Sequence, residues 1–180
     1  ALVIDVMPAD ITHADVGLKT RARAKINLTL HVGAARKDGY HPLQSLVVFA
    51  DIGDELSVDF AANTTDFSLT VDGPFAEGLS CRQDNLIYQA HHAILSYLHS
   101  DKQDKRQASY HLCKNLPIAS GIGGGSADAA ATLRLMNTTA KLADTDLLEI
   151  GRKLGADVPV CIGSITCMMA GIGERIIALP

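Results

Sequence analysis

The segment from Lys19 to Val32 alternates strictly between polar and apolar residues. A period of two is typical of a β-strand with one apolar face. Lys25 and Asn27 fall on the polar face, so their side chains are expected to point the same way, about 7 Å apart. We predict one strand over the whole of this segment.

Shorter stretches of similar pattern follow along the chain. The further predicted strands are residues 43–50, 51–60, 66–71 and 108–114. The second of them carries Leu56, Val58 and Phe60 on one face. Between residues 86 and 98 the apolar side chains recur at helical spacing instead, which predicts an amphipathic helix.

The last part of the chain mixes a helix with short strands. A helix is predicted over residues 145–155, with Thr145 or Asp144 as its N-cap and Gly155 at its C-terminal end. Residues 157–177 are expected to form two short strands around glycines. Strands that come first and helices that come later, without strict alternation, favour an α+β fold over a doubly wound sheet.

Composition narrows the class of protein. The chain has 180 residues, 47% of them hydrophobic, and a net charge of −4, which gives no bias toward nucleic acid or membrane. No apolar run approaches the roughly 20 residues that span a bilayer, and the first residues lack the basic start of a signal peptide. The cysteines at positions 81, 113, 161 and 167 form no CxxC pair, so we expect buried, reduced thiols in a cytoplasmic protein.

The stretch NLPIASGIGGGSADAAATLRLM, residues 115–136, places four glycines within five residues and then a run of good helix formers. Glycine lets the backbone adopt positive φ and expose its N–H groups. Free N–H groups next to a helix N-terminus bind anions, above all phosphate. We predict a phosphate loop over residues 121–126, with a helix that begins at Ser126.

These glycines do not fit the two commonest nucleotide-binding patterns. The P-loop pattern GxxxxGK[ST] needs a lysine that does not follow them here. The dinucleotide pattern GxGxxG needs a glycine where Ser126 stands. A tight turn that needs glycine only for packing is the alternative interpretation.

The segment PIASGIGGGSADAA, residues 117–130, resembles the phosphate loop of the GHMP kinases, which phosphorylate small alcohols with ATP. Residues 24–56, 84–90 and 153–176 are similar to the branch of that family that phosphorylates the 2-hydroxyl of 4-diphosphocytidyl-2-C-methyl-D-erythritol in non-mevalonate isoprenoid synthesis. The resemblance implies a ribosomal protein S5 domain 2-like α+β domain. It also implies a C-terminal domain that is largely missing from this chain.

The resemblance implies a role for several side chains around the reacting alcohol. Asp157 would accept or orient the hydroxyl proton, and Lys25 would keep that carboxylate ionised and neutralise developing charge. Asn27 would bind the acceptor alcohol. Tyr40 would stack on the cytosine, and His41 would meet its polar edge.

The resemblance also implies a set of ATP contacts and a Mg²⁺ ion. The phosphate loop would be formed by Pro117, Gly121, Gly123, Gly124, Gly125 and Ser126. Asn85, Leu86 and Lys114 would meet the adenosine. Ser126 is the candidate ligand for Mg²⁺, which phosphoryl transfer requires.

The sequence departs from the family pattern at one position of the loop, and other functions are consistent with it. The family usually has a second serine where Ala127 stands. We divide the chain into an N-terminal extension, residues 1–20, and a kinase domain, residues 21–180. A kinase acting on homoserine or mevalonate, a non-catalytic S5-like binding module and an inactive fragment are the alternatives. The expected partner is a small-molecule substrate, without nucleic acid or membrane, for a monomer or homodimer.

Overall fold

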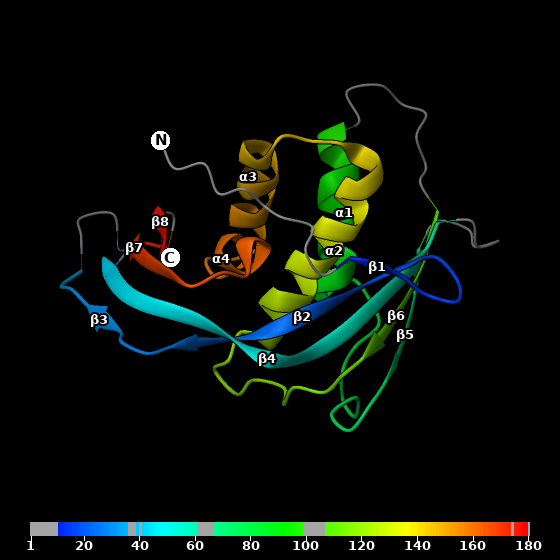
Figure 1. Ribbon diagram of the computed structural model, residues 1–180, viewed down its shortest axis with the longest axis horizontal. Helices are drawn as coiled ribbons and strands as arrows, with labels where there is room; N and C mark the ends of the chain where they lie inside the picture. The colour runs from blue at the N-terminus through cyan, green and yellow to red at the C-terminus, as the bar shows by residue number, and fades with distance from the viewer. Residues whose placement is uncertain are drawn as a thin grey trace.

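The computed structural model describes residues 11–35, 39, 41–60, 67–98, 107–173 and 175–179. Tyr40, a predicted substrate contact, lies outside these ranges. A curved sheet carries the helices on one of its faces (Figure 1). The predicted α+β class is confirmed.

The sheet is built around one long strand. Its strands are β1 (Thr12–His13), β2 (Leu18–Asn27), β3 (His31–Val32), β4 (Leu43–Asp59), β5 (Phe67–Asp72), β6 (Ala108–Cys113), β7 (Cys167–Gly171) and β8 (Arg175–Ala178). The order β1-β2-β4-β6-β5 forms the main path, while β3 and β7 pair with the first part of β4 and β8 pairs with β7. The β5–β6 pair is parallel and the other pairs are antiparallel. Two segments that we predicted as separate strands, 43–50 and 51–60, are therefore one element.

Strand β2 departs from the strict alternation predicted for it. The register with β4 shifts between Arg23, which pairs with Gly53, and Lys25, which pairs with Phe49. The shift inverts the two faces, so Lys25 is only 2% exposed whereas Ile26 is 38% exposed. The strand also ends at Asn27, short of the predicted Val32.

Gly53 marks the place in β4 where this shift occurs. A Cβ atom built on Gly53 would lie 2.4 Å from the carbonyl oxygen of Ala22. A glycine inside a strand commonly marks such a close approach of another backbone. The tight contact between β2 and β4 at this point depends on the missing side chain.

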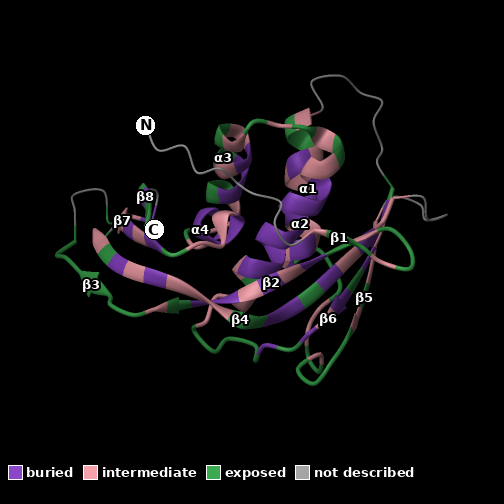
Figure 2. Ribbon diagram, in the orientation of Figure 1, coloured by how far each residue is buried: buried purple, intermediate pink, exposed green. Residues whose placement is uncertain are grey.

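The helices are α1 (Leu86–Leu98), α2 (Gly124–Ala140), α3 (Asp144–Leu154) and α4 (Val158–Gly163). The predicted amphipathic helix α1 is confirmed. Helix α2 is central: every residue from Ala127 to Met136 is buried, and Figure 2 shows most of its length in the buried colour. Its small alanine side chains let it pack against β2, β4, α1 and α4 at the same time.

Three details of the predicted helices and strands are wrong. Helix α2 begins at Gly124 with Gly123 as its N-cap, two residues before the predicted Ser126. Helix α3 has Ala143 as its N-cap, without a side-chain cap, in place of Thr145 or Asp144. The two short strands predicted within residues 157–177 are present as β7 and β8, but residues 158–163 form a helix, because Pro159 suits the first turn of a helix and the apolar segment is buried among α2 and α3.

Candidate active site

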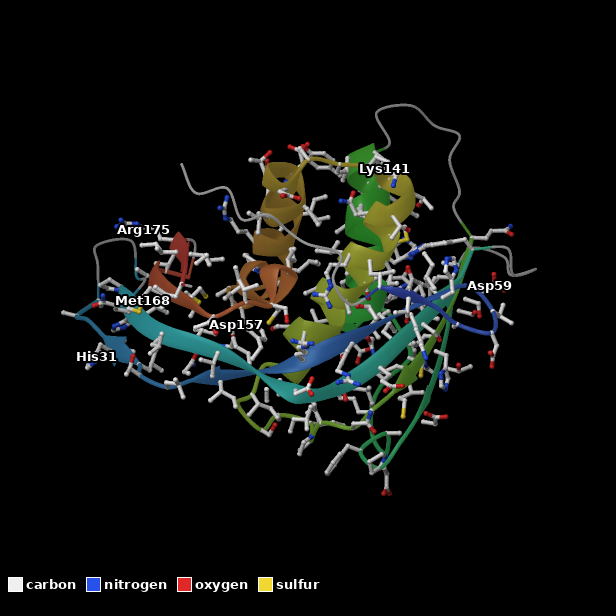
Figure 3. All side chains as sticks on the ribbon, in the orientation of Figure 1. His31, Asp59, Lys141, Asp157, Met168 and Arg175 are labelled. Carbon is white, nitrogen blue, oxygen red and sulfur yellow. The ribbon has the colours of Figure 1, made fainter. Side chains whose placement is uncertain are left out.

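Lys25 and Asp157 meet where β2 faces the start of α4. The Lys25 Nζ lies 3.0 Å from Asp157 Oδ2. The lysine side chain is 2% exposed and the aspartate side chain 38% exposed, so a buried ammonium holds a carboxylate that still reaches solvent. In Figure 3, Asp157 lies between α4 and strands β2 and β4. The predicted pair is thus brought together, in a geometry that suits proton handling.

Asn27 completes the group on β2. The Lys25 Nζ donates a hydrogen bond of 3.3 Å to Asn27 Oδ1. The prediction that these two side chains point the same way is confirmed. The bond orients the amide beside the ion pair, where it can contact a bound alcohol.

The glycine loop passes directly over Lys25. The Lys25 backbone N–H donates to the Ile122 carbonyl at 2.9 Å. Gly123 has φ +69°, and a Cβ on it would lie 3.3 Å from both Cβ and Cε of Lys25. The loop therefore needs glycine at this position for its backbone conformation and for the space that the lysine occupies.

The first turn of α2 supplies N–H groups for an anion. Gly124, Gly125 and Ser126 are its first three residues, and N–H groups at these positions have no intrahelical acceptor. The N-terminus of a helix also carries a partial positive charge. Because the turn follows Gly123, which touches Lys25, an anion bound there lies close to the Lys25–Asp157 pair.

A second cluster of charged side chains lies behind the loop. The Lys114 Nζ donates to Asp54 Oδ2 and, at 2.9 Å, to Asp128 Oδ2. The side chains of Lys114, Asp54 and Asp128 are 3%, 0% and 5% exposed. A Cβ on Gly124 would lie 3.2 Å from Lys114 Nζ. The ammonium thus sits immediately beneath the first residue of α2.

Burial and charge shift the proton affinities in this cluster. Burial raises the pKa of Asp128 to about 7; the attraction of Lys114 works against this rise, and the charge of Asp54 adds to it. Burial acts to lower the pKa of Lys114, but its attraction to Asp128 and its hydrogen bond to Asp54 outweigh burial and raise it. Lys114 stays charged at neutral pH, whereas Asp128 is poised to change its charge.

The predicted adenosine contacts have structural roles as well. The Asn85 side chain caps α1: its Oδ1 accepts from the Ile87 N–H at 2.8 Å, and its Nδ2 donates to the Ser80 carbonyl at 2.6 Å. Leu86 lies against the loop, since a Cβ on Gly125 would be 3.3 Å from Leu86 Cδ1. Lys114 contacts the loop from behind, in the buried cluster described above.

The other predicted contacts lie on more exposed parts of the chain. Pro117 and Gly121 are exposed, and the Pro117 carbonyl accepts from Ser120 Oγ at 2.9 Å. His41 is exposed and its Nδ1 lies 2.9 Å from the Gly33 carbonyl, at the turn between β3 and β4. Gly121 precedes Ile122, whose carbonyl accepts from the Lys25 N–H, so the loop joins this exposed part of the chain to the ion pair.

The predicted Mg²⁺ site depends on which side-chain oxygen atoms lie near the glycine loop. Within the described ranges no group of three or more histidine, cysteine, aspartate or glutamate side chains could hold a metal ion. Mg²⁺ in nucleotide sites is usually held by one or two protein oxygens together with phosphates and water. The half-buried Ser126, at the third position of α2, and the partly exposed Asp157 carboxylate are oxygen donors of the kind that such a site uses.

Two of the buried charged side chains were not predicted from the sequence. Asp54 and Asp128 were not predicted as site residues, although an aspartate among the apolar residues of a strand and another inside an alanine-rich helix were visible signals. Charged side chains are rarely buried unless they are paired. The pattern could have indicated a buried ion cluster, but not that Lys114 joins both carboxylates.

Among the described residues, no helix is both long and apolar enough to cross a bilayer. Cys161 and Cys167 are buried free thiols, while Cys81 is exposed and Cys113 half-buried. The expectation of buried thiols thus holds for two of the four.

Residues 85–164 match the family described as GHMP kinases N terminal domain. The chain is 45% identical over 177 residues to a 4-diphosphocytidyl-2-C-methyl-D-erythritol kinase of Rhodopseudomonas palustris (strain BisB18), covering 97% of this chain and 54% of that protein. It is 49% identical over 162 residues to a protein of the same name from Agrobacterium fabrum (strain C58 / ATCC 33970), covering 88% and 53%. The chain spans about half the length of the curated relatives it matches.

Solved structures show the same likeness. The crystal structure of a 4-(cytidine 5'-diphospho)-2C-methyl-D-erythritol kinase is 34% identical with a TM-score of 0.66, covering 89% of this chain and 55% of that one. The Methanococcus jannaschii mevalonate kinase has a TM-score of 0.65 at 12% identity, covering 93% and 57%, which shows a shared fold. Together with the glycine loop over Lys25, these matches make the chain similar over most of its own length to 4-diphosphocytidyl-2-C-methyl-D-erythritol kinases, and residues 85–164 match the GHMP kinase N-terminal domain.

Proposed function

We propose that this chain forms the ATP-binding part of a kinase that phosphorylates the 2-hydroxyl of 4-diphosphocytidyl-2-C-methyl-D-erythritol. The observation that carries the proposal is the Lys25–Asp157 ion pair of 3.0 Å beneath a glycine loop that opens a long helix. The names of the relatives at 44–49% identity support the choice of substrate. Residues 21–180 would form this domain, after an extension of residues 1–20.

The geometry suits phosphoryl transfer to an alcohol, which depends on positioning and charge stabilisation. The Asp157 carboxylate, partly exposed, accepts or orients the proton of the substrate hydroxyl. Lys25 holds that carboxylate in place and supplies positive charge next to the reacting groups. The N–H groups of Gly124, Gly125 and Ser126 bind the phosphates of ATP.

The remaining contacts complete the proposed site. Mg²⁺ supplies charge neutralisation on the phosphates, with Ser126 as its proposed protein ligand. Asn27 binds the acceptor alcohol, and Tyr40 and His41 recognise the cytosine. Asn85, Leu86 and Pro117 complete the ATP side, and Lys114 acts there from beneath the loop. We place the reaction in the cytoplasm, where ATP is available, and the state of assembly, monomer or homodimer, stays a prediction.

The test is ADP release by the protein at its natural full length, with ATP, Mg²⁺ and 4-diphosphocytidyl-2-C-methyl-D-erythritol. We expect turnover that Asp157→Asn and Lys25→Met each lower by at least about a hundredfold. Glu149→Gln, on the exposed face of α3, is the matched control and should keep full activity. Turnover with homoserine or mevalonate, but none with the cytidine compound, would replace the proposed substrate and the roles of Tyr40 and His41.

A further inference from the structure

The buried cluster of Asp54, Lys114 and Asp128 spans the two ends of the phosphate loop. We propose that Asp54 and Asp128 are positioning residues of this loop: through Lys114 they set its conformation and tune its affinity for phosphate. The inference rests on the proposed binding of ATP at residues 121–126. Neither carboxylate is exposed enough to meet the nucleotide itself, so both act through other groups.

Asp54 fixes the start of the loop to the sheet. Its Oδ1 accepts two backbone N–H groups, from Asn115 at 2.6 Å and from Leu116 at 2.8 Å. Its Oδ2 accepts from Lys114 Nζ. Both carboxylate oxygens are therefore used, and the chain leaves β6 in a direction that one side chain of β4 determines.

Asp128 fixes the end of the loop. It lies in the second turn of α2 and accepts from Lys114 Nζ at 2.9 Å. The same ammonium lies 3.2 Å from where a Cβ of Gly124 would be, so it supports the first residue of the helix. Lys114 thereby ties both ends of the segment between residues 114 and 128, which contains the whole loop, and its N–H groups are held in place before a ligand arrives.

The charges of the cluster bear on affinity as well as on position. Two carboxylates face one ammonium, which leaves one negative charge in excess directly behind a site for a polyanion. Asp128 Oδ1 is buried and has no hydrogen-bond partner among the described residues. An unpartnered buried carboxylate oxygen is costly when charged, and its charge opposes the binding of a polyanion in front of it.

The experiment measures the dissociation constant of Mg·ATP, and the KM for ATP and kcat, at pH 8 for the protein at its natural full length. Asp128→Asn keeps the shape and an acceptor for Lys114 but removes the excess negative charge behind the loop. We expect it to bind Mg·ATP more tightly than the wild type, by up to about tenfold, the size for one charge on the order of 10 Å away at an effective dielectric constant of about 20.

Asp54→Asn removes an acceptor from the start of the loop. We expect its KM for ATP to rise by about tenfold or more, with a smaller change in kcat, because the bonds that it weakens hold Asn115 and Leu116 at the start of the loop, whereas Ile122 and Gly123 keep their contacts with Lys25. Glu149→Gln again serves as control. Unchanged Mg·ATP affinity in Asp128→Asn would overturn the inference, as would unchanged ATP binding in a folded Asp54→Asn; if Asp54→Asn does not fold, Asp128→Asn decides alone. Absence of ATP binding in the wild type would instead overturn the proposed function together with this inference.

Discussion

Two glycines of the phosphate loop allow a matched test of how the loop supports Lys25. Gly121 and Gly123 both have left-handed backbones, with φ +75° and +69°. A Cβ on Gly121 would meet nothing within 4 Å, whereas one on Gly123 would lie 3.3 Å from Cβ and Cε of Lys25. Alanine at either position thus introduces the same backbone strain, but only Gly123→Ala presses on the lysine.

The magnitudes of the two effects can be separated. A left-handed alanine costs roughly 1–2 kcal/mol relative to glycine, so both variants should lose about this much free energy of unfolding. At 3.3 Å the neighbour must move by a few tenths of an ångström. The Lys25 backbone cannot follow freely, because its N–H is bonded to Ile122 in the same loop. The 3.0 Å contact to Asp157 is therefore expected to lengthen, which should lower kcat in Gly123→Ala by about tenfold.

The assay compares urea unfolding and steady-state kinetics of the two variants with the wild type. We expect similar losses of stability from the shared backbone strain, with the loss in Gly123→Ala no smaller than that in Gly121→Ala, and a loss of kcat beyond that of Gly121→Ala only in Gly123→Ala. Equal kcat values for the two variants would refute the reasoning, since the contact with Lys25 would then have no effect on catalysis. A Gly123→Ala variant more stable than Gly121→Ala would contradict the tight contact with Lys25.

Three further predictions concern stability. Because the pKa of Asp128 is raised in the folded chain, the folded chain keeps a proton that the unfolded chain releases above about pH 4. The free energy of unfolding should therefore fall by up to a few kcal/mol between pH 4 and pH 7 and level off above pH 7. Urea unfolding should show no such decrease in Asp128→Asn. Arg134 donates to the carbonyls of Cys161 at 2.8 Å and Arg21 at 2.9 Å. Arg134→Met should lower the free energy of unfolding by about 2–4 kcal/mol, and the exposed Arg152→Met by less than about 0.5 kcal/mol. Similar losses in both variants would contradict a role for these bonds. Tyr110 is buried, which raises its pKa, and it shares a 3.1 Å hydrogen bond with His91. Tyr110→Phe should therefore lower the free energy of unfolding by about 1 kcal/mol in thermal unfolding, without changing the affinity for ATP. A gain in stability would count against that bond.

Patterns within short windows predicted much of this molecule. The helical period of residues 86–98 is carried by neighbouring side chains and needs no partner to be read, and α1 has the predicted extent. The glycine run likewise predicted a loop that opens a helix, because backbone freedom is a property of the residues themselves. The pairing of Lys25 with Asp157 came from family resemblance, since each residue alone is an ordinary surface type.

Packing between distant segments decided the rest. The register shift opposite Gly53 turned Lys25 inward, although the alternation placed it on the polar face of a strand. Residues 158–163 became a helix because an apolar run of that length suits either structure, and burial against α2 and α3 settled the choice. Lys114 found two buried carboxylates from β4 and α2, an arrangement that depends on how three elements meet. Local sequence therefore determined which elements form and where the backbone is free, while the environment of each charge was set by contacts between residues far apart in the chain, whose energies exist only once the fold is made.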